Sequence, residues 1–188
     1  MPLTPYHFGP SGLIGLLFKR WIDLPVFVLA NVVVDIEVLV ILLFGLGCPV
    51  HRYCHTLLIG GAVGALWGFG AYPLRGLWRG IMSAFRLPYQ PTIGKMVISG
   101  VLGVWTHVLI DGMQHADMKI LWPNTTFSLV AFGERYLGGH RVEHLSVLLL
   151  LCALAVYGFQ MSRSNHAAPK DGTLQLTRNP QRPIVPKG

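Results

Sequence analysis

Charged residues are scarce in this chain: of 188 residues, only 12% are Asp, Glu, Lys or Arg, whereas 52% are hydrophobic. A soluble domain usually carries about 25% charged residues. The mean hydropathy of +0.51 points the same way. With only three cysteines, the chain also lacks a disulfide framework. The composition therefore excludes an ordinary soluble domain and predicts that much of the surface meets lipid.

Acidic residues are the scarcer charged class, 8 against 15 basic ones, which gives a formal net charge of +7. Such an excess is compatible with nucleic acid or with anionic lipid as a partner. The basic residues gather in loops and in the carboxyl-terminal tail, which is how membrane proteins distribute them. We therefore expect membrane lipids as partners and no nucleic acid, while the oligomeric state stays open.

Four long apolar stretches cover about 24–46, 56–74, 96–113 and 142–161. Each approaches the ~20 residues that a helix needs to cross ~30 Å of hydrocarbon. A fifth, 8–18, is shorter and predicts a half-inserted or tilted helix. In the second stretch Gly60, Gly64 and Gly68 recur every four residues, a weak signal of close helix packing.

We therefore predict an all-α, polytopic membrane helix bundle of four to five transmembrane helices. It occupies residues 1–161 and is followed by a disordered, basic cytoplasmic tail at 162–188, because that segment is polar and rich in proline. If the four long spans alternate, three basic segments fall on one side, which should be cytoplasmic. These segments contain Lys19, Arg20, Arg75, Arg79, Arg86, Lys95 and the tail. The opposite side has Arg52, Lys119, Arg135 and Arg141, offset by Asp117 and Glu134. We expect a multi-pass protein of the inner (plasma) membrane.

Seven of the eight histidines lie in or beside the apolar part of the chain. Residues four apart on a helix project from one face, and two such side chains can bind one metal ion. This spacing joins His51 to His55, His107 to Asp111, Asp111 to His115, and His140 to His144. The pattern favours a metal site over scattered packing histidines.

Asp35 lies in the middle of the first long stretch, where an ionisable residue costs roughly 2.5 to 3.5 kcal/mol or more and needs a partner. A cation would balance this carboxylate. Glu37, two positions on, would point nearly the opposite way, so both carboxylates cannot face one site unless the helix is broken. Asp117 is expected to be a solvated loop charge.

With the basic loops in the cytoplasm, the candidate ligands gather at the outer end of the bundle. His7 joins them only if residues 8–18 cross the membrane or dip inward from outside. The predicted metal ligands are His7, Asp35, His51, His55, His107, Asp111 and His115, and the expected ion is Zn²⁺ or another divalent metal such as Mn²⁺.

These residues carry a family resemblance over about residues 1–130. Thr4-Pro5-Tyr6-His7, Asp35-Ile36-Glu37, His51-Arg52-Tyr53-Cys54-His55-Thr56, and His107-Val-Leu-Ile-Asp111 followed by Leu121-Trp122-Pro123 resemble the bacterial and archaeal membrane-bound metal-dependent hydrolases (YdjM-like proteins). That family is in turn similar to zinc-dependent phospholipases C, all-helical enzymes with a comparable order of ligands. The order here is His7, Asp35, His55, His107, Asp111, His115, then His140 with Glu143, where the last step is one residue short.

The leading hypothesis is metal-assisted hydrolysis of a phosphoester, such as a lipid headgroup. Asp35 or Glu143 would act as the general base, and Arg52 would hold a phosphate oxygen or merely anchor the loop at the headgroups. Two alternatives stay open. One is a haem-binding membrane electron-transfer protein, and the other is a non-catalytic metal-binding membrane module.

Overall fold

The computed structural model describes residues 4–137 and 141–167, and every regular element in them is a helix. The elements are η1 (Thr4–His7), α1 (Phe8–Leu17), α2 (Leu24–Leu43), α3 (Leu57–Ala71), η2 (Tyr72–Leu74), α4 (Arg75–Ala84), α5 (Ile93–Gly112), α6 (Val130–Leu137) and α7 (Arg141–Ala167). The predicted all-α class is confirmed. Helix α7 extends to Ala167, so it includes the first six residues of the segment predicted as a tail, 162–167. His140 lies outside the described residues.

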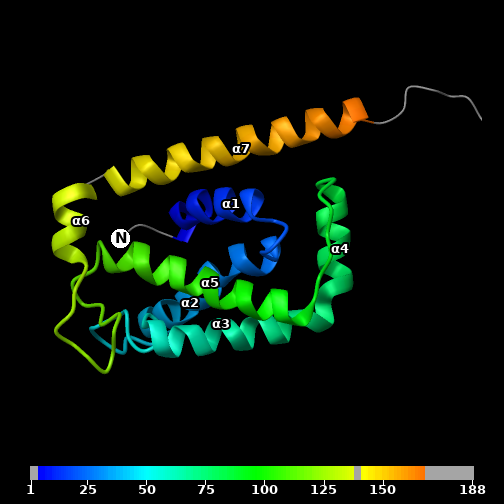
Figure 1. Ribbon diagram of the computed structural model, residues 1–188. Coiled ribbons are helices and arrows are strands. Elements are labelled where there is room, and N and C mark those ends of the chain that lie inside the picture. Colours follow the sequence, from blue (N-terminus) through cyan, green and yellow to red (C-terminus); the bar gives the residue numbers. More distant parts are fainter. Residues whose placement is uncertain (1–3, 138–140, 168–188) are drawn as a thin grey trace, which may run out of the picture.

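Four helical segments are long and apolar enough to cross a membrane: Leu24–Leu43, Leu57–Ala84, Ile93–Gly112 and Arg141–Arg163. The second combines α3 with α4, but the chain turns sharply at η2, so that α4 lies across one end of the bundle (Figure 1). Pro73 in η2 suits this corner, because proline lacks the N–H that a continuous helix needs. The span predicted at 56–74 therefore corresponds to α3 and η2.

Glycines bring α5 against both of its neighbours. A Cβ on Gly64 of α3 would lie 2.5 Å from the carbonyl oxygen of Gly100, and a Cβ on Gly103 would lie 2.6 Å from Cβ of Ala30 in α2. Backbones this close leave no room for a side chain, which is the way small residues pack membrane helices. Helix α5 is consequently held between α2 and α3, and it carries two of the predicted ligands.

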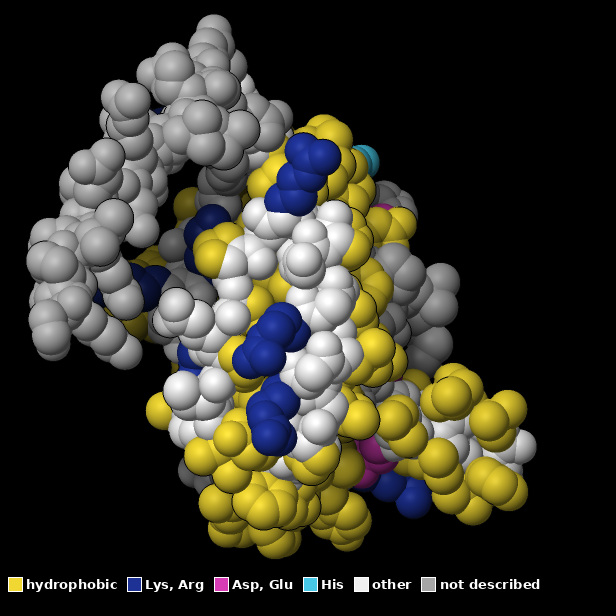
Figure 2. All heavy atoms as spheres, turned by 90° about the vertical axis from the view of Figure 1, so that its right-hand side faces the viewer, with side chains coloured by type: hydrophobic (Ala, Val, Ile, Leu, Met, Phe, Trp, Pro, Cys, Tyr) yellow, Lys and Arg dark blue, Asp and Glu magenta, His cyan; other side chains and the backbone are white. Residues whose placement is uncertain are grey.

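The two ends of the bundle differ in chemistry. At the basic end, defined by Lys19, Arg20, Arg75, Arg79, Arg86 and Lys95, Lys and Arg side chains spread over the face shown in Figure 2. At the opposite end, here called the site end, α2 and α5 finish and α3 begins (Figure 1). Helix α1 also starts at the site end and runs toward the basic end (Figure 1), so His7, which precedes it, lies at the site end.

Candidate metal centre

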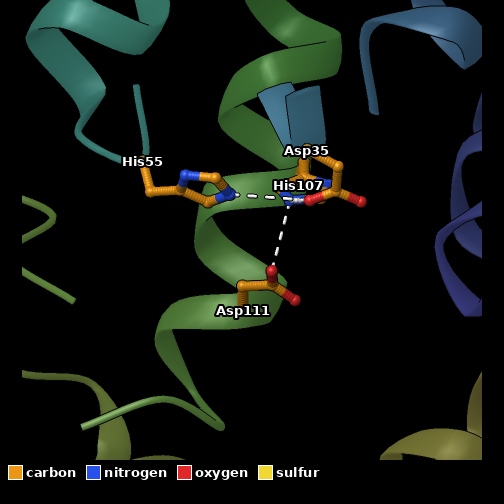
Figure 3. A group of neighbouring side chains, drawn as sticks. All are labelled: Asp35, His55, His107 and Asp111. Atoms are coloured by element: carbon orange, nitrogen blue, oxygen red, sulfur yellow. Dashed lines mark ion pairs between the residues drawn. The ribbon is translucent and has the colours of Figure 1, made fainter. Parts of the chain in front are cut away.

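Four side chains from three segments converge inside the site end (Figure 3). Asp35 comes from α2, His55 from the loop before α3, and His107 with Asp111 from successive turns of α5. Each offers one ligand atom, and these atoms all lie within 4.8 Å of one another. We call this set the four-residue group. All four were predicted as metal ligands from the sequence, and the two histidines are fully buried.

The spacing of the ligand atoms suits a small cation. Oδ1 of Asp35 lies 3.6 Å from Nε2 of His55 and 3.2 Å from Nε2 of His107. Oδ2 of Asp111 lies 3.2 Å from the same His107 nitrogen. With ligand atoms about 2.0 to 2.2 Å from zinc, a tetrahedral arrangement puts neighbouring ligand atoms about 3.3 to 3.6 Å apart. The observed separations of 3.2 to 3.6 Å are close to these distances between ligand atoms.

Nδ1 of His7 and Nδ1 of His107 are buried without a hydrogen-bond partner among the described residues. Nε2 of His7, His55 and His107 face carboxylate oxygens at 2.9 to 3.6 Å. A buried polar group without a partner costs about 1 to 3 kcal/mol, so such a concentration requires an explanation. Two carboxylates and two imidazoles facing one point would be balanced by a divalent cation. The residues present therefore fit a metal ion.

Glu37 is the functional residue that sequence reasoning missed. Its Oε2 accepts a hydrogen bond from Nδ1 of His55 at 3.0 Å, so Nε2 of that ring carries the lone pair and faces Asp35. The expectation that Asp35 and Glu37 cannot both face one site unless the helix is broken agrees with the possible metal group, because Asp35 belongs to it and Glu37 does not. Helix α2 is continuous, and the two carboxylates reach opposite edges of a single imidazole that the loop inserts beside them.

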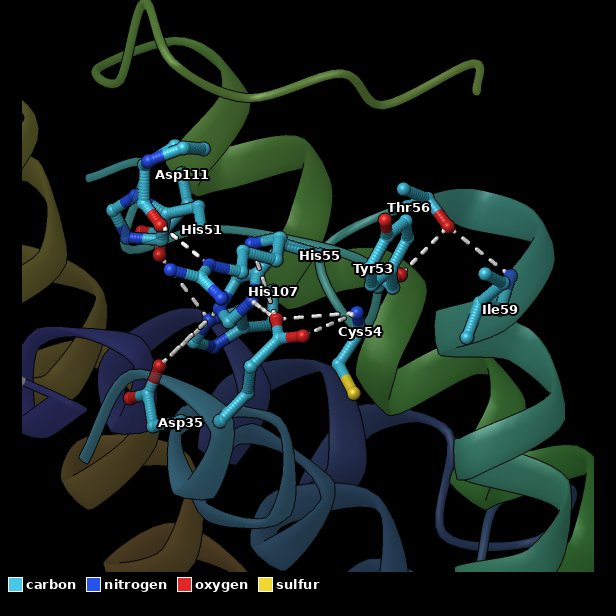
Figure 4. Close-up of polar contacts among 12 residues, drawn as sticks. Asp35, His51, Tyr53, Cys54, His55, Thr56, Ile59, His107 and Asp111 are labelled. Atoms are coloured by element: carbon cyan, nitrogen blue, oxygen red, sulfur yellow. Dashed lines mark hydrogen bonds and ion pairs between the residues drawn. The ribbon is translucent and has the colours of Figure 1, made fainter. Parts of the chain in front are cut away.

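The loop that carries His55 is fixed by its own polar contacts (Figure 4). Glu37 accepts further hydrogen bonds from the backbone N–H groups of Arg52 at 3.2 Å and Cys54 at 3.1 Å. Thr56 caps α3, because its hydroxyl accepts from N–H of Ile59 at 3.1 Å and donates to the Tyr53 carbonyl. His55 is therefore held immediately before a helix start and beside the α2 carboxylates.

The two carboxylates leave His55 in a surrounding that favours positive charge. Burial lowers the pKa of His55, but the contacts with Asp35 and Glu37 outweigh it, and the pKa lies above its usual value. The same negative field attracts a proton or a metal cation. With the proton on Nδ1 directed to Glu37, a metal would bind at Nε2.

His7 lies beside the four-residue group and supports it. Its Nε2 is 2.9 Å from Oδ1 of Asp111, and its ring stacks on His107 with centroids 4.2 Å apart. The ring is 2% exposed. Because Asp111 uses its other oxygen toward His107, His7 is placed to orient that carboxylate. The structure thus brings His7 to the predicted place, in contact with one ligand.

His51 and His115 form a second group with Asp117, in which all ligand atoms again lie within 4.8 Å of one another. Nδ1 of His51 lies 3.2 Å from both Asp117 oxygens. The prediction of a solvated loop charge at Asp117 is therefore wrong, because the loop after α5 folds back over His51. Burial raises the pKa of Asp117, yet His51 brings it below its usual value. Burial and His51 both lower the pKa of His115.

Arg52 and Glu143 were predicted to take part in catalysis. The Arg52 guanidinium donates to the carbonyls of Pro49 at 3.0 Å and Leu46 at 2.8 Å, which closes its own loop. Glu143 lies half-buried in the first turn of α7, and neither possible metal group among the described residues contains it. The next residue, His144, is exposed. The catalytic roles of Arg52 and Glu143 remain predictions.

A pocket of about 300 Å³ opens beside the second group. Its lining includes His51, Asp117, Arg52, Lys119, Tyr53 and Trp122. The rings of His51 and His55 lie edge to face with centroids 4.9 Å apart, so the pocket adjoins the four-residue group through these two histidines. Two cations and two aromatic rings thus line a pocket whose wall includes His51, the neighbour of His55.

Comparisons of the chain with protein-family models, with curated proteins and with solved structures find no match.

Proposed function

We propose that the chain is an integral membrane metal-dependent hydrolase whose ion is held by His55, His107 and Asp111, with the Asp35 carboxylate facing the same point. The observation that carries the proposal is the convergence of two carboxylates and two imidazoles from separate segments on one buried point. The Nε2 atoms of His55 and His107 support it, because both lie within 3.6 Å of the same Asp35 oxygen. A divalent cation would neutralise both carboxylates.

Zinc is the metal we propose, with Mn²⁺ as the second choice. Imidazole suits zinc, and a mixed nitrogen and carboxylate donor set also suits manganese. When bound, zinc would lower the pKa of a coordinated water to about 7 and polarise a phosphoryl oxygen. His51, His115 and Asp117 offer a position for a further cation of the same kind.

Asp35 is the residue we propose as general base. It is the most exposed of the four, at 23%, while Asp111 is at 5% and both histidines are at 0%. A carboxylate that is partly exposed can accept a proton from the attacking water. His55, His107 and Asp111 would then hold the ion. Glu37 would fix the His55 tautomer, and His7 would orient Asp111.

A phosphoester is the proposed substrate, most plausibly in a lipid headgroup. The pocket beside the site carries Arg52 and Lys119, whose positive charge suits a phosphate, and Tyr53 and Trp122, which suit the membrane interface. Its volume of about 300 Å³ fits a headgroup rather than a whole lipid. The acyl chains would stay in the bilayer while the ester enters the pocket.

We also propose an orientation with the basic end in the cytoplasm. Lys and Arg dominate that end (Figure 2), and cytoplasmic loops carry such an excess. The metal centre would then lie toward the extracytoplasmic side of the inner (plasma) membrane. Cysteine or glycosylation mapping of the loops tests this orientation independently of activity.

The test of the hydrolase is turnover of a phosphoester by the purified protein in lipid nanodiscs, loaded with Zn²⁺ or Mn²⁺. A panel of phospholipids with different headgroups would be followed by release of the phosphorylated product. Asp35→Asn should reduce kcat at least 100-fold, whereas Glu134→Gln, an exposed carboxylate on α6, should leave it unchanged. A metal-loaded protein that hydrolyses none of the panel would instead support the non-catalytic metal-binding module.

The haem alternative has less support. Its two imidazoles would have to stand on either side of a wide macrocycle, but the rings of His55 and His107 are 5.4 Å apart at centroids and tilted by 59°. Asp35 Oδ1 also lies within 3.6 Å of a nitrogen of each ring. A bare cation suits this geometry better. A Soret band in the purified protein would reverse this ranking.

A further inference from the structure

A basic pocket of about 570 Å³ lies at the end of the bundle opposite the four-residue group. It is lined by Lys19, Arg20, Trp21, Gln90, Thr92 and Lys95, with Pro88 completing the wall. None of these lining residues is acidic. The nearby Asp23 is buried, where it accepts hydrogen bonds from Tyr89 at 3.3 Å and from the Val26 N–H. The pocket thus offers three cations to an anion.

The pocket is held in shape by contacts between distant parts of the chain. Nζ of Lys95 donates to the carbonyl oxygen of Lys19 at 2.9 Å, which fastens the turn between α1 and α2 to the start of α5. Nζ of Lys19 donates to Oε1 of Gln160 in α7. Arg20 is exposed beside these two lysines. The two lysines therefore belong to a packed corner of the fold, and Arg20 follows Lys19 on its surface.

An apolar groove of about 450 Å³ lies next to this corner, between α1, α2, α4 and α7. Its lining is apolar and includes Leu16, Leu24, Met82, Phe85, Leu154 and Tyr157. The pocket and the groove are lined by residues that are close in sequence. Leu87 lines the groove and Pro88 lines the pocket. Trp21 lines the pocket, and Leu24, three residues on, lines the groove. A molecule with a charged head and an apolar chain can reach both.

We propose that this corner is a binding site for one anionic phospholipid, with its phosphate in the basic pocket and an acyl chain in the groove. The charge of the pocket selects an anionic headgroup, since Lys and Arg side chains near a membrane surface attract anionic lipids. The groove opens between four helices, and its apolar lining suits an acyl chain. The site is separate from the metal centre and does not depend on the proposed hydrolase activity.

The test compares phosphatidylglycerol with phosphatidylcholine of the same acyl chains. Each is titrated into the purified full-length protein in detergent, and binding is measured by native mass spectrometry and by the shift in Tm. Phosphatidylglycerol should bind at least fivefold more tightly. Arg20→Gln should bring its affinity down to that of phosphatidylcholine. Arg79→Gln, which removes an exposed cation of α4 that does not line the pocket, should keep the preference.

The groove is tested by filling it. Leu154→Trp should weaken both lipids at least threefold, whereas Leu151→Trp, at an equally exposed position of α7 outside the lining, should not. Inorganic phosphate should give less than a tenth of the Tm shift of phosphatidylglycerol at equal concentration. Equal binding of the two lipids, an unchanged preference in Arg20→Gln, equal effects of the two tryptophans, or an equal shift with inorganic phosphate would each overturn the proposal.

Discussion

Glu37 Oε2 lies 3.0 Å from Nδ1 of His55, and this contact sets which nitrogen of the ring faces Asp35. The carboxylate also accepts two backbone N–H groups of the same loop. One side chain of α2 therefore both positions a loop and fixes the tautomer of its histidine. Metal-binding histidines commonly have such a carboxylate behind them.

Glu37→Gln should weaken metal binding about tenfold without removing it, because loss of a partner behind a ligating histidine typically costs 10 to 100-fold in affinity. The zinc affinity would be measured by competition with a chromogenic chelator. Glu134→Gln removes an exposed carboxylate that belongs to neither possible metal group and serves as the control. Identical affinities of Glu37→Gln and the unmodified protein would rule out the role of this contact.

The reactivity of the Cys54 thiol tests the position of Glu37 in the absence of a metal. Burial, then the charge and hydrogen bond of Glu37, raise the pKa of the Cys54 thiol to about 11. At pH 8 only about 0.1% would be thiolate, the form that reacts. In a variant with Cys54 as its sole cysteine, maleimide labelling should be slow and should rise about tenfold per pH unit up to pH 10. Glu37→Gln should lower the pKa and speed labelling at pH 8. A labelling midpoint near pH 8.5 in the single-cysteine variant that keeps Glu37 would contradict this account.

Gly64 should tolerate no side chain. A Cβ there would lie 2.5 Å from the Gly100 carbonyl oxygen, so Gly64→Ala must push α3 away from α5, at a cost of about 1 to 3 kcal/mol. The matched control is Gly70→Ala in the same helix, where a Cβ would meet nothing within 4 Å. Thermal unfolding in detergent should show a lower Tm for Gly64→Ala alone. Similar Tm values for both variants would mean that the helices are not in this contact.

The second group should hold its own ion. His115→Ala should lower the metal content by one ion per chain, while the four-residue group keeps its ion. Because burial and His51 lower the pKa of His115, its imidazole is neutral and ready to bind metal at pH 7. Elemental analysis after dialysis measures the content, with exposed His144→Ala as control. Equal content in His115→Ala and the control means that no separate ion is bound there.

Much of this architecture is predictable from the sequence. The apolar stretches give the four spans, and the spacing of His107 and Asp111 places both on one face of α5, since a regular helix repeats that face every turn. The same argument failed for His115, because α5 ends at Gly112 and the chain then turns toward His51. The roles of Glu37 and Asp117 depend on where two loops fold, and no periodic pattern encodes that.

The most direct test of the metal centre is the zinc and manganese content of the protein purified without added chelator. The unmodified chain and His144→Ala should each retain at least one ion per chain. His107→Ala combined with Asp111→Ala should lose the ion of the four-residue group while staying folded by circular dichroism. Equal metal content in all three proteins, or content near zero in all of them, would contradict the account.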